Sequence, residues 1–213
     1  AITYHRDTLQ DPAWAGAMGV ALGGDASVAT SGFWAALTMA TTLKLPMLFY
    51  IEDNDLGISV KGGMQTPGGN IARNLAAFGE LFIRDGDGTD PDATARLVRE
   101  CVAHVRSGAG PALVHLTVPR LSSHSGPDNQ KGYRTDAEIA ADQARDPLPR
   151  LKEYLVPALL SEADWAALEY EVMRDVEVNP HTVLQAVEEH LHMMPSFAGR
   201  DLRVTPATKL VFK

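Results

Sequence analysis

The 213-residue sequence has one cysteine, few aromatic residues (7%) and no long apolar run. Cys101 has no second cysteine with which to form a disulfide, and we interpret it as a small core residue of a helix. A transmembrane helix needs about 20 consecutive apolar residues, and no stretch approaches that length. No export signal with a charged and an apolar region is visible, although a removed leader is not excluded. These absences favour a cytoplasmic protein, and the length of 213 residues favours one or two domains.

Runs of basic residues are also missing. The formal net charge is −8, with 27 acidic residues against 19 Lys and Arg. This balance argues against nucleic acid or an anionic membrane surface as a partner. A site for an anionic ligand would therefore need arginines placed locally, and Arg6 and Arg120 are the candidates.

Residues 24–54 have the pattern of one β–α–β step. A turn at Gly24-Asp25-Ala26 is followed by helical spacing over 33–40 and by the apolar run Met47–Ile51, which indicates a buried strand. In open parallel sheets ligands bind at the carboxyl ends of strands, so Asp25 and Asn54 should face one crevice. A carboxylate and an amide oxygen suit a hard cation such as Mg²⁺. The pair alone is a weak signal, because ordinary α/β proteins often have such residues at strand ends.

The spacing from Gly24-Asp25 to Asn54 resembles the thiamine diphosphate motif, and Gly57-Ile58-Ser59 resembles the triplet that follows this motif in one family. That family is the α subunit of the E1 component of 2-oxoacid dehydrogenase complexes. The resemblance implies an α/β thiamine diphosphate-binding fold, with a parallel sheet flanked by helices and a helical C-terminal part. It also implies Mg²⁺ ligands at Asp25, Asn54 and the backbone carbonyl of Leu56.

The same resemblance implies contacts of Asp25, Ala26, Asn54 and Ile58 with the cofactor. Ala26 departs from the family, which has a second Gly there, and so removes some backbone freedom at a tight turn. Asp53 also departs from it, because the family usually has Asn at that position. Neither residue replaces a direct ligand.

A second match lies in residues 120–134, which resemble the phosphorylation-loop region of the E1 α subunit. It follows a predicted strand over 112–117, so it lies on a loop at a strand's carboxyl end. The resemblance implies that Arg120 binds the diphosphate, for which a forked guanidinium is well suited. It implies that His124 is the catalytic residue and contacts the cofactor, because imidazole exchanges protons near neutral pH. Asp128 and Arg134 could hold the loop closed through a charge pair.

A third match is Tyr4-His5-Arg6-Asp7, which resembles a Tyr-Arg-Asp segment whose Arg reaches the diphosphate; a plain surface turn is nearly as good an interpretation. The family has a longer stretch between this segment and its Gly-Asp-Gly than Thr8–Gly23 provides. Residues 13–22 have a pattern more typical of a helix than of the strand that the fold requires. We therefore expect that segments of the natural protein are missing here.

The remaining pattern is also of the α/β type. Helical spacing is predicted over 70–78, a short strand over 80–84, an acidic turn over 85–91, a helix over 91–106 and a strand over 112–118. The turn lacks the residue order of a calcium-binding EF-hand, and Asp90 as N-cap with Pro91 at the first helical position explains it. His115 alternates within its strand, so we interpret it as a satisfied core or edge histidine and not as a ligand.

The sequence turns helical and acidic after Thr135, with a capping arrangement at Ser161–Asp164. We predict an E1α-like domain over residues 1–156 and a helical extension over 157–213. Residues 195–208 resemble a stretch of the E1 β subunit, which would make the chain an α–β fusion. His190 and His192 alternate, so on a helix they would point to different faces and would not form a metal pair.

The resemblance implies an E1 enzyme that decarboxylates a 2-oxoacid with thiamine diphosphate and Mg²⁺ and passes the acyl group to lipoyl on E2. The loop around His124 slightly favours a branched-chain substrate over pyruvate. The implied partners are an E1β subunit or fused β portion and a lipoyl-bearing E2 acyltransferase, in a homodimer or an α₂β₂-type oligomer. Two alternatives stay open: another thiamine diphosphate enzyme, such as an acetoin-cleaving one, or a non-catalytic E1α-like domain that binds a partner.

Overall fold

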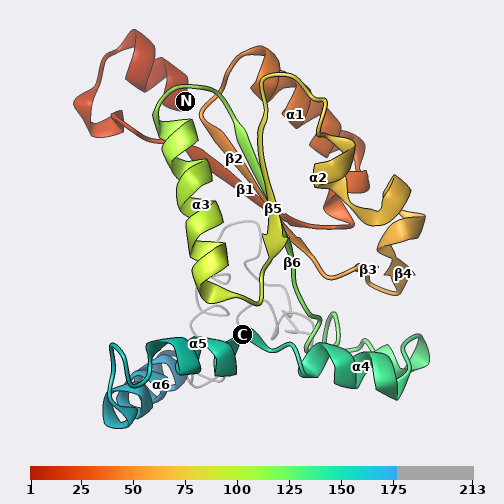
Figure 1. Cartoon of the computed structure of the whole chain (residues 1–213). Coiled ribbons are helices and arrows are strands. Elements are labelled where there is room, and N and C mark those ends of the chain that lie inside the picture. The colour runs from red at the N-terminus through yellow and green to blue at the C-terminus, as the bar shows by residue number, and fades with distance from the viewer. Residues whose placement is uncertain (177–213) are drawn as a thin grey trace, which may run out of the picture. The chain divides into compact units, whose positions relative to one another are not determined.

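The computed structural model describes residues 1–176, and their side chains as far as Tyr170 (Figure 1). The chain divides into two units. The first contains residues 1–121 and 136–151, and the second begins with residues 122–135 and continues from Lys152. The predicted tail features at 190–192 and 195–208 lie outside the described residues.

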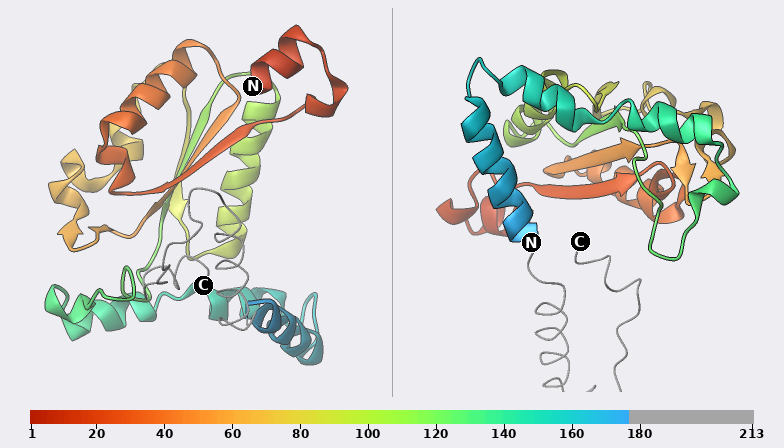
Figure 2. Two further views of the ribbon diagram at one scale, coloured as in Figure 1. Left: turned by 180° about the vertical axis from the view of Figure 1, so that it is seen from behind. Right: turned by 90° about the horizontal axis from the view of Figure 1, so that it is seen from below.

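The first unit is built on a four-stranded parallel sheet in the order β1-β2-β6-β5. Helices α1 and α2 lie on one side of the sheet and α3 lies on the other (Figures 1 and 2). This confirms the predicted parallel sheet flanked by helices. The elements are β1 (Gly19–Gly24), α1 (Ser31–Thr42), β2 (Met47–Asp53), α2 (Ile71–Asn74), β5 (Phe82–Asp87), α3 (Pro91–Arg106) and β6 (Ala112–Thr117).

Two apolar clusters pack against the sheet, one on each face. The first joins Leu37 of α1 and Leu75 to Phe49 and Leu113, and all four are at most 3% exposed. The second joins Cys101 and Val105 of α3 to strand residues on the opposite face. Cys101 is fully buried, which confirms its interpretation as a core residue.

The helical interpretation of residues 13–22 is wrong. Residues 12–14 form a single 3₁₀ turn, and β1 then pairs in parallel with β2, with Gly19 opposite Met47 and Gly24 opposite Glu52. Glycine is a poor helix former, and three of the six residues of β1 are glycines, so pairing with an apolar neighbour decides the conformation. The strand that appeared to be missing is therefore present.

Two further predictions need correction. The strand predicted over 80–84 begins later, at Phe82, and runs through Asp85 to Asp87, so the acidic turn is confined to residues 88–90. The helix predicted over 70–78 is only the four residues of α2. By contrast, Asp90 accepts a hydrogen bond from the backbone of Ala93 at 3.0 Å, which confirms it as the N-cap of α3.

The other elements are short or follow the sheet in the sequence. A two-residue hairpin, β3 (Leu56–Gly57) and β4 (Val60–Lys61), follows β2, and α4 (Asp136–Gln143) and α5 (Pro147–Leu155) follow the loop after β6. Helix α6 (Glu162–Val176) belongs to the second unit, and its start confirms the predicted cap because Ser161 and Asp164 exchange hydrogen bonds. In the described part of the chain, no helix has the length and apolarity to cross a membrane. The domain boundary at residue 156 stays a prediction.

Candidate functional site

The structure brings Asp25 and Asn54 together at the carboxyl ends of β1 and β2. Asp25 directly follows β1 and is 5% exposed, and Asn54 directly follows β2 and is half-buried. Burial raises the pKa of Asp25, and the charge of Asp53 adds to this effect, whereas the backbone N–H of Asn54 acts in the opposite direction. The acid is thus held where its charged form is costly unless a positive partner arrives.

One oxygen of Asp25 is unsatisfied. Among the described residues no group donates a hydrogen bond to its buried Oδ2. Buried polar atoms are nearly always paired, so an exception indicates a ligand or a strained site. No group of three or more His, Cys, Asp or Glu in the described residues forms a metal site. A site made of one carboxylate, one amide and one backbone carbonyl would not belong to that class, and its oxygen donors are those that Mg²⁺ prefers.

The turn after β2 holds the other two predicted metal ligands. Asp53 Oδ1 accepts a hydrogen bond from the backbone of Asp55 at 2.8 Å, and Asn54 Oδ1 accepts one from the backbone of Leu56 at 3.1 Å. Gly62 closes the loop, because its N–H donates to the carbonyl oxygen of Asp55 at 3.0 Å and to its Oδ1 at 3.1 Å. A Cβ at Gly62 would lie 3.7 Å from Asp25 Oδ2, so this glycine borders the acid.

Ala26 does not need the conformational freedom of the glycine that it replaces. Its φ of −69° and ψ of −30° are ordinary right-handed helical values. A Cβ built on Gly57 would lie 2.8 Å from the Cβ of Ala26, so the two positions are in close contact and only one of them has room for a side chain. The departure at Ala26 is therefore compatible with the fold of the turn.

Ile58 and Arg120 meet at the hairpin. Ile58 has a φ of +59°, which is unusual for a β-branched residue, and its carbonyl oxygen accepts a hydrogen bond from Arg120 Nη1 at 2.5 Å. The backbone N–H of Arg120 donates to Asp142 of α4 at 3.1 Å, and the residue is 6% exposed. Arg120 is thus anchored beside the hairpin, and its contact with a diphosphate stays a prediction.

His124 belongs to the second unit. Its backbone N–H donates to Asp128 Oδ2 at 2.8 Å, and the hydroxyl of Tyr133 donates to the same oxygen at 2.6 Å. Asp128 thus organises the loop that carries His124. The catalytic role of His124 and the pairing of Asp128 with Arg134 stay predictions.

Arg6 lies in the segment that precedes β1. It is in a π-helical turn (Tyr4–Thr8), and its guanidinium pairs with the carboxylate of Asp7 at 2.5 and 2.9 Å. Figure 1 draws this segment, in red, at the edge of the sheet where the strands begin, whereas Asp25 follows the end of β1. The structure therefore does not bring Arg6 and Asp25 together, and the diphosphate role of Arg6 stays a prediction.

Sequence reasoning missed a cluster around a buried histidine beside the turn. His115 on β6 is 1% exposed, with Nε2 at 2.8 Å from Asp53 Oδ2 and Nδ1 at 2.7 Å from Asp85 Oδ1. Burial alone would lower the pKa of His115, but the hydrogen bonds and charges of both aspartates outweigh it and raise the pKa. The prediction of a satisfied core histidine is confirmed. Its two partners could not be named because Asp85 was assigned to a turn.

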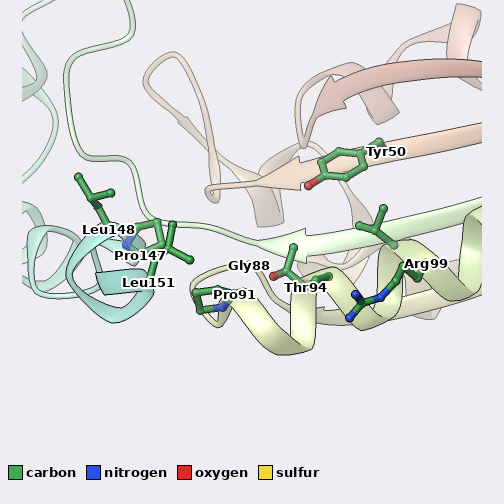
Figure 3. A pocket seen from close by; sticks show the side chains of 10 residues that line it. Tyr50, Gly88, Pro91, Thr94, Arg99, Pro147, Leu148 and Leu151 are labelled. Atoms are coloured by element: carbon green, nitrogen blue, oxygen red, sulfur yellow. The ribbon is translucent and has the colours of Figure 1, made fainter. Parts of the chain in front are cut away.

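The first unit also has an apolar pocket of about 570 Å³ on the α3 side of the sheet (Figure 3). Tyr50 and residues of α3 lie on one side of it, and Pro147, Leu148 and Leu151 lie on the other. None of the predicted site residues lines it, so this pocket is separate from the turn after β2. Its full lining is Tyr50, Gly88, Pro91, Thr94, Ala95, Val98, Arg99, Pro147, Leu148 and Leu151.

Comparison with known proteins shows the family to which the chain belongs. The model of the family described as dehydrogenase E1 component matches residues 13–191, well over half of the chain. The chain belongs to the dehydrogenase E1 component family. The match includes β1, the turn with Asn54 and the cluster around His115, so these features lie within the family's own region.

Curated relatives agree with the family. The 3-methyl-2-oxobutanoate dehydrogenase subunit alpha of Mycobacterium tuberculosis is 32% identical over 136 residues, 64% of this chain and 37% of that protein. The chloroplastic pyruvate dehydrogenase E1 component subunit alpha-3 of Arabidopsis thaliana is 33% identical over 159 residues, which are 74% of this chain and 37% of that protein. The 2-oxoisovalerate dehydrogenase subunit alpha of Bacillus subtilis is 30% identical over 132 residues, which are 62% of this chain and 40% of that protein. The chain thus spans about two fifths of the length of these relatives.

Proposed function

We propose that this chain is the cofactor-binding part of an E1 α subunit that decarboxylates a 2-oxoacid with thiamine diphosphate and Mg²⁺. The observation that carries the proposal is the unsatisfied Oδ2 of buried Asp25, next to Asn54, at the carboxyl ends of two adjacent parallel strands. Membership of the dehydrogenase E1 component family supports it. The names of the curated relatives, which are α subunits of 2-oxoacid dehydrogenases, support it as well.

In this proposal each site residue has a role that follows from its chemistry. Asp25, Asn54 and the carbonyl oxygen of Leu56 hold Mg²⁺, and the cation satisfies the orphaned carboxylate oxygen. Thiamine diphosphate, when bound, supplies the carbanion and the electron sink for decarboxylation. Arg120 binds the diphosphate, to which the guanidinium offers parallel donors. Ala26 and Ile58 line the cofactor, and Arg6 is a further candidate for the diphosphate.

His124 handles the proton during acyl transfer in this proposal. An imidazole can both accept and donate a proton, as the addition to a carbonyl and its reversal require. The hydrogen bonds that Asp128 accepts from the His124 backbone and from Tyr133 support the loop that presents the ring. Replacing His124 by Ala should spare cofactor binding and slow acyl transfer by ~10²–10⁴-fold.

The substrate and partners are proposed from the relatives. A 2-oxoacid is the substrate class, and a branched-chain acid is favoured over pyruvate on the loop around His124, although relatives of both kinds are found. An E1β subunit, or a β portion of the same protein, completes the enzyme, and a lipoyl-bearing E2 receives the acyl group. We propose a cytoplasmic location, although one of the relatives is chloroplastic.

Calorimetric titration tests the metal site. Thiamine diphosphate is titrated into the protein together with its E1β partner, in Mg²⁺ and again in EDTA. Binding should require Mg²⁺, and Asp25→Ala should abolish the Mg²⁺-dependent part. Equal affinity in Mg²⁺ and EDTA, or an unchanged Asp25→Ala variant, would remove the ligand assignment. No binding under any condition would favour the partner-binding domain without catalysis.

A reduction assay with dichlorophenolindophenol then identifies the reaction. The substrates are 3-methyl-2-oxobutanoate, pyruvate and acetoin, each at the same concentration. The branched-chain acid should give the highest kcat/KM. A higher value with pyruvate would correct the substrate, and turnover of acetoin alone would replace the proposed reaction with that of an acetoin-cleaving enzyme.

A further inference from the structure

A buried histidine ties the metal-site turn to the centre of the sheet. His115 lies on β6, which runs between β2 and β5, and its register partners are Ile51 and Asp85. Its two ring nitrogens reach Asp53 of β2 and Asp85 of β5 at 2.8 and 2.7 Å. The ring therefore links the side chains of three adjacent strands.

The chemistry of this contact defines the charge of the ring. An ionised carboxylate can only accept a hydrogen bond, whereas a neutral imidazole has a single N–H to donate. Two carboxylates that both accept need a proton on each ring nitrogen, and the contacts with Asp53 and Asp85 favour this protonated ring because they raise the pKa of His115. Such charge-assisted hydrogen bonds are short and about twice as strong as neutral ones, so they fix the orientation of Asp53.

Asp53 passes this constraint to the turn that follows it. One of its carboxylate oxygens, Oδ2, faces His115, and the other, Oδ1, accepts the N–H of Asp55 at 2.8 Å. Asp55 has a φ of +61°, a left-handed conformation that is unfavourable for an L-residue. The hydrogen bond that Asp53 accepts from Asp55 offsets part of that cost, and Asn54 and Leu56 lie on either side of Asp55.

The other end of this chain of hydrogen bonds is anchored as well. Asp85 Oδ2 accepts a hydrogen bond from Asn70 Nδ2 at 3.1 Å, and Asn70 is also the N-cap of α2. A continuous path thus runs from α2 through Asp85, His115 and Asp53 to the turn. Among the described residues, the side chains of Asp85, His115 and Asp53 form no hydrogen bond with the proposed ligand Asp25, so the effect of His115 on the metal site has to act through Asp53 and the turn.

We infer that His115 is a positioning residue for the Mg²⁺ site, which it serves by fixing Asp53 and, through Asp53, the turn that carries Asn54 and Leu56. The inference rests on the proposed function, because it assumes that this turn binds Mg²⁺. Residues that orient metal ligands in this way affect metal affinity by about 10–100-fold when they are replaced.

The test measures the Mg²⁺ concentration that gives half-maximal binding of thiamine diphosphate to the protein with its E1β partner. His115→Gln and Asp53→Ala should each raise it by about 10–100-fold. The double variant should be no weaker than Asp53→Ala, because His115 acts only through Asp53. Unchanged affinity in His115→Gln, or effects of the two substitutions that multiply, would overturn the inference.

His104→Gln is the matched control. His104 lies on α3, where its ring stacks on Phe82 with 4.3 Å between the ring centroids. Replacing it removes a half-buried histidine of the same unit without touching the turn, so Mg²⁺ affinity should not change. An equal loss of affinity in this control would mean that general destabilisation, and not positioning, explains the result for His115.

Hydrogen exchange provides a readout without metal. The amides of Asp55 and Leu56 should exchange faster in His115→Gln than in the wild-type protein, because both are hydrogen-bonded within the turn. Asp85→Asn, at a side chain that is 35% exposed, is the milder variant if His115→Gln does not fold, and it should shift exchange in the same direction. Unchanged exchange would overturn the inference. A wild-type protein that binds no Mg²⁺ would instead remove the proposed function, and exchange would still decide whether His115 holds the turn.

Discussion

Adding a methyl group at Gly62 tests whether the loop around the candidate site is as tightly closed as its hydrogen bonds indicate. A Cβ at this position would lie 2.7 Å from Asp55 Oδ1 and 3.4 Å from the Cα of Asp55. The Asp55 side chain must therefore move, and its Oδ1 loses the hydrogen bond that it accepts from the Gly62 N–H at 3.1 Å. The bond from the same N–H to the Asp55 carbonyl can remain.

Gly63 provides a control within the same 3₁₀ turn (Gly62–Met64). A Cβ at Gly63 would meet nothing within 4 Å, and neither glycine has a positive φ. Both Gly→Ala substitutions reduce the entropy of the unfolded chain, which stabilises the protein by about 0.4–1 kcal/mol. This contribution cancels in the comparison, so the difference between the two variants measures the lost hydrogen bond and the displaced side chain.

A typical hydrogen bond contributes about 0.5–1.5 kcal/mol, so Gly62→Ala should be less stable than Gly63→Ala by about that amount. Urea unfolding followed by circular dichroism measures the difference, provided that both variants unfold with the same m-value. Equal stability of the two variants would refute the reasoning. If Asp25 and this loop form one site, Gly62→Ala should also weaken Mg²⁺ binding, whereas Gly63→Ala should not.

Two further predictions concern titratable groups. Burial raises the pKa of the Cys101 thiol to about 11, so Ellman's reagent should label this thiol only as fast as the protein unfolds. Rapid labelling of the folded protein at pH 8 would contradict this prediction. The pKa of His115 is raised from 6.5, so its stabilisation is complete below pH 6.5 and is lost as the pH rises through the folded-state pKa. The difference in unfolding free energy between the wild type and His115→Gln should therefore shrink at higher pH. The pKa of His104 is lowered, mainly by burial, so the difference for His104→Gln should change in the opposite direction.

The local sequence was sufficient to predict those elements whose structure depends on their own residues. Helix α1 and strand β2 have clear hydrophobic patterns in the sequence. The rule that ligands lie at the carboxyl ends of parallel strands then placed Asp25 and Asn54 at the same end of the sheet. The cap of α3 was predictable as well, because Asp90 and Pro91 act through their own backbone geometry. These features depend on residues that are close in the sequence.

The sequence was insufficient where distant strands decide the outcome. β1 is rich in glycine and has no strong pattern, so only its pairing with β2 makes it a strand. The Asp85-Gly86-Asp87 stretch has the composition of a turn, yet pairing with β6 keeps it extended. His115 meets Asp53 and Asp85 because three strands share one register, and no spacing along the chain could show that.

The acids at this edge of the sheet differ in whether the protein itself satisfies them. Asp53 and Asp85 each pair with a ring nitrogen of His115, and Asp55 accepts a hydrogen bond from the N–H of Gly62. Asp25 is the exception: it is buried, the charge of Asp53 raises its pKa further, and its Oδ2 has no donor among the described residues. In the proposed function a cation satisfies this oxygen, and the neighbouring turn supplies the other ligands from Asn54 and Leu56.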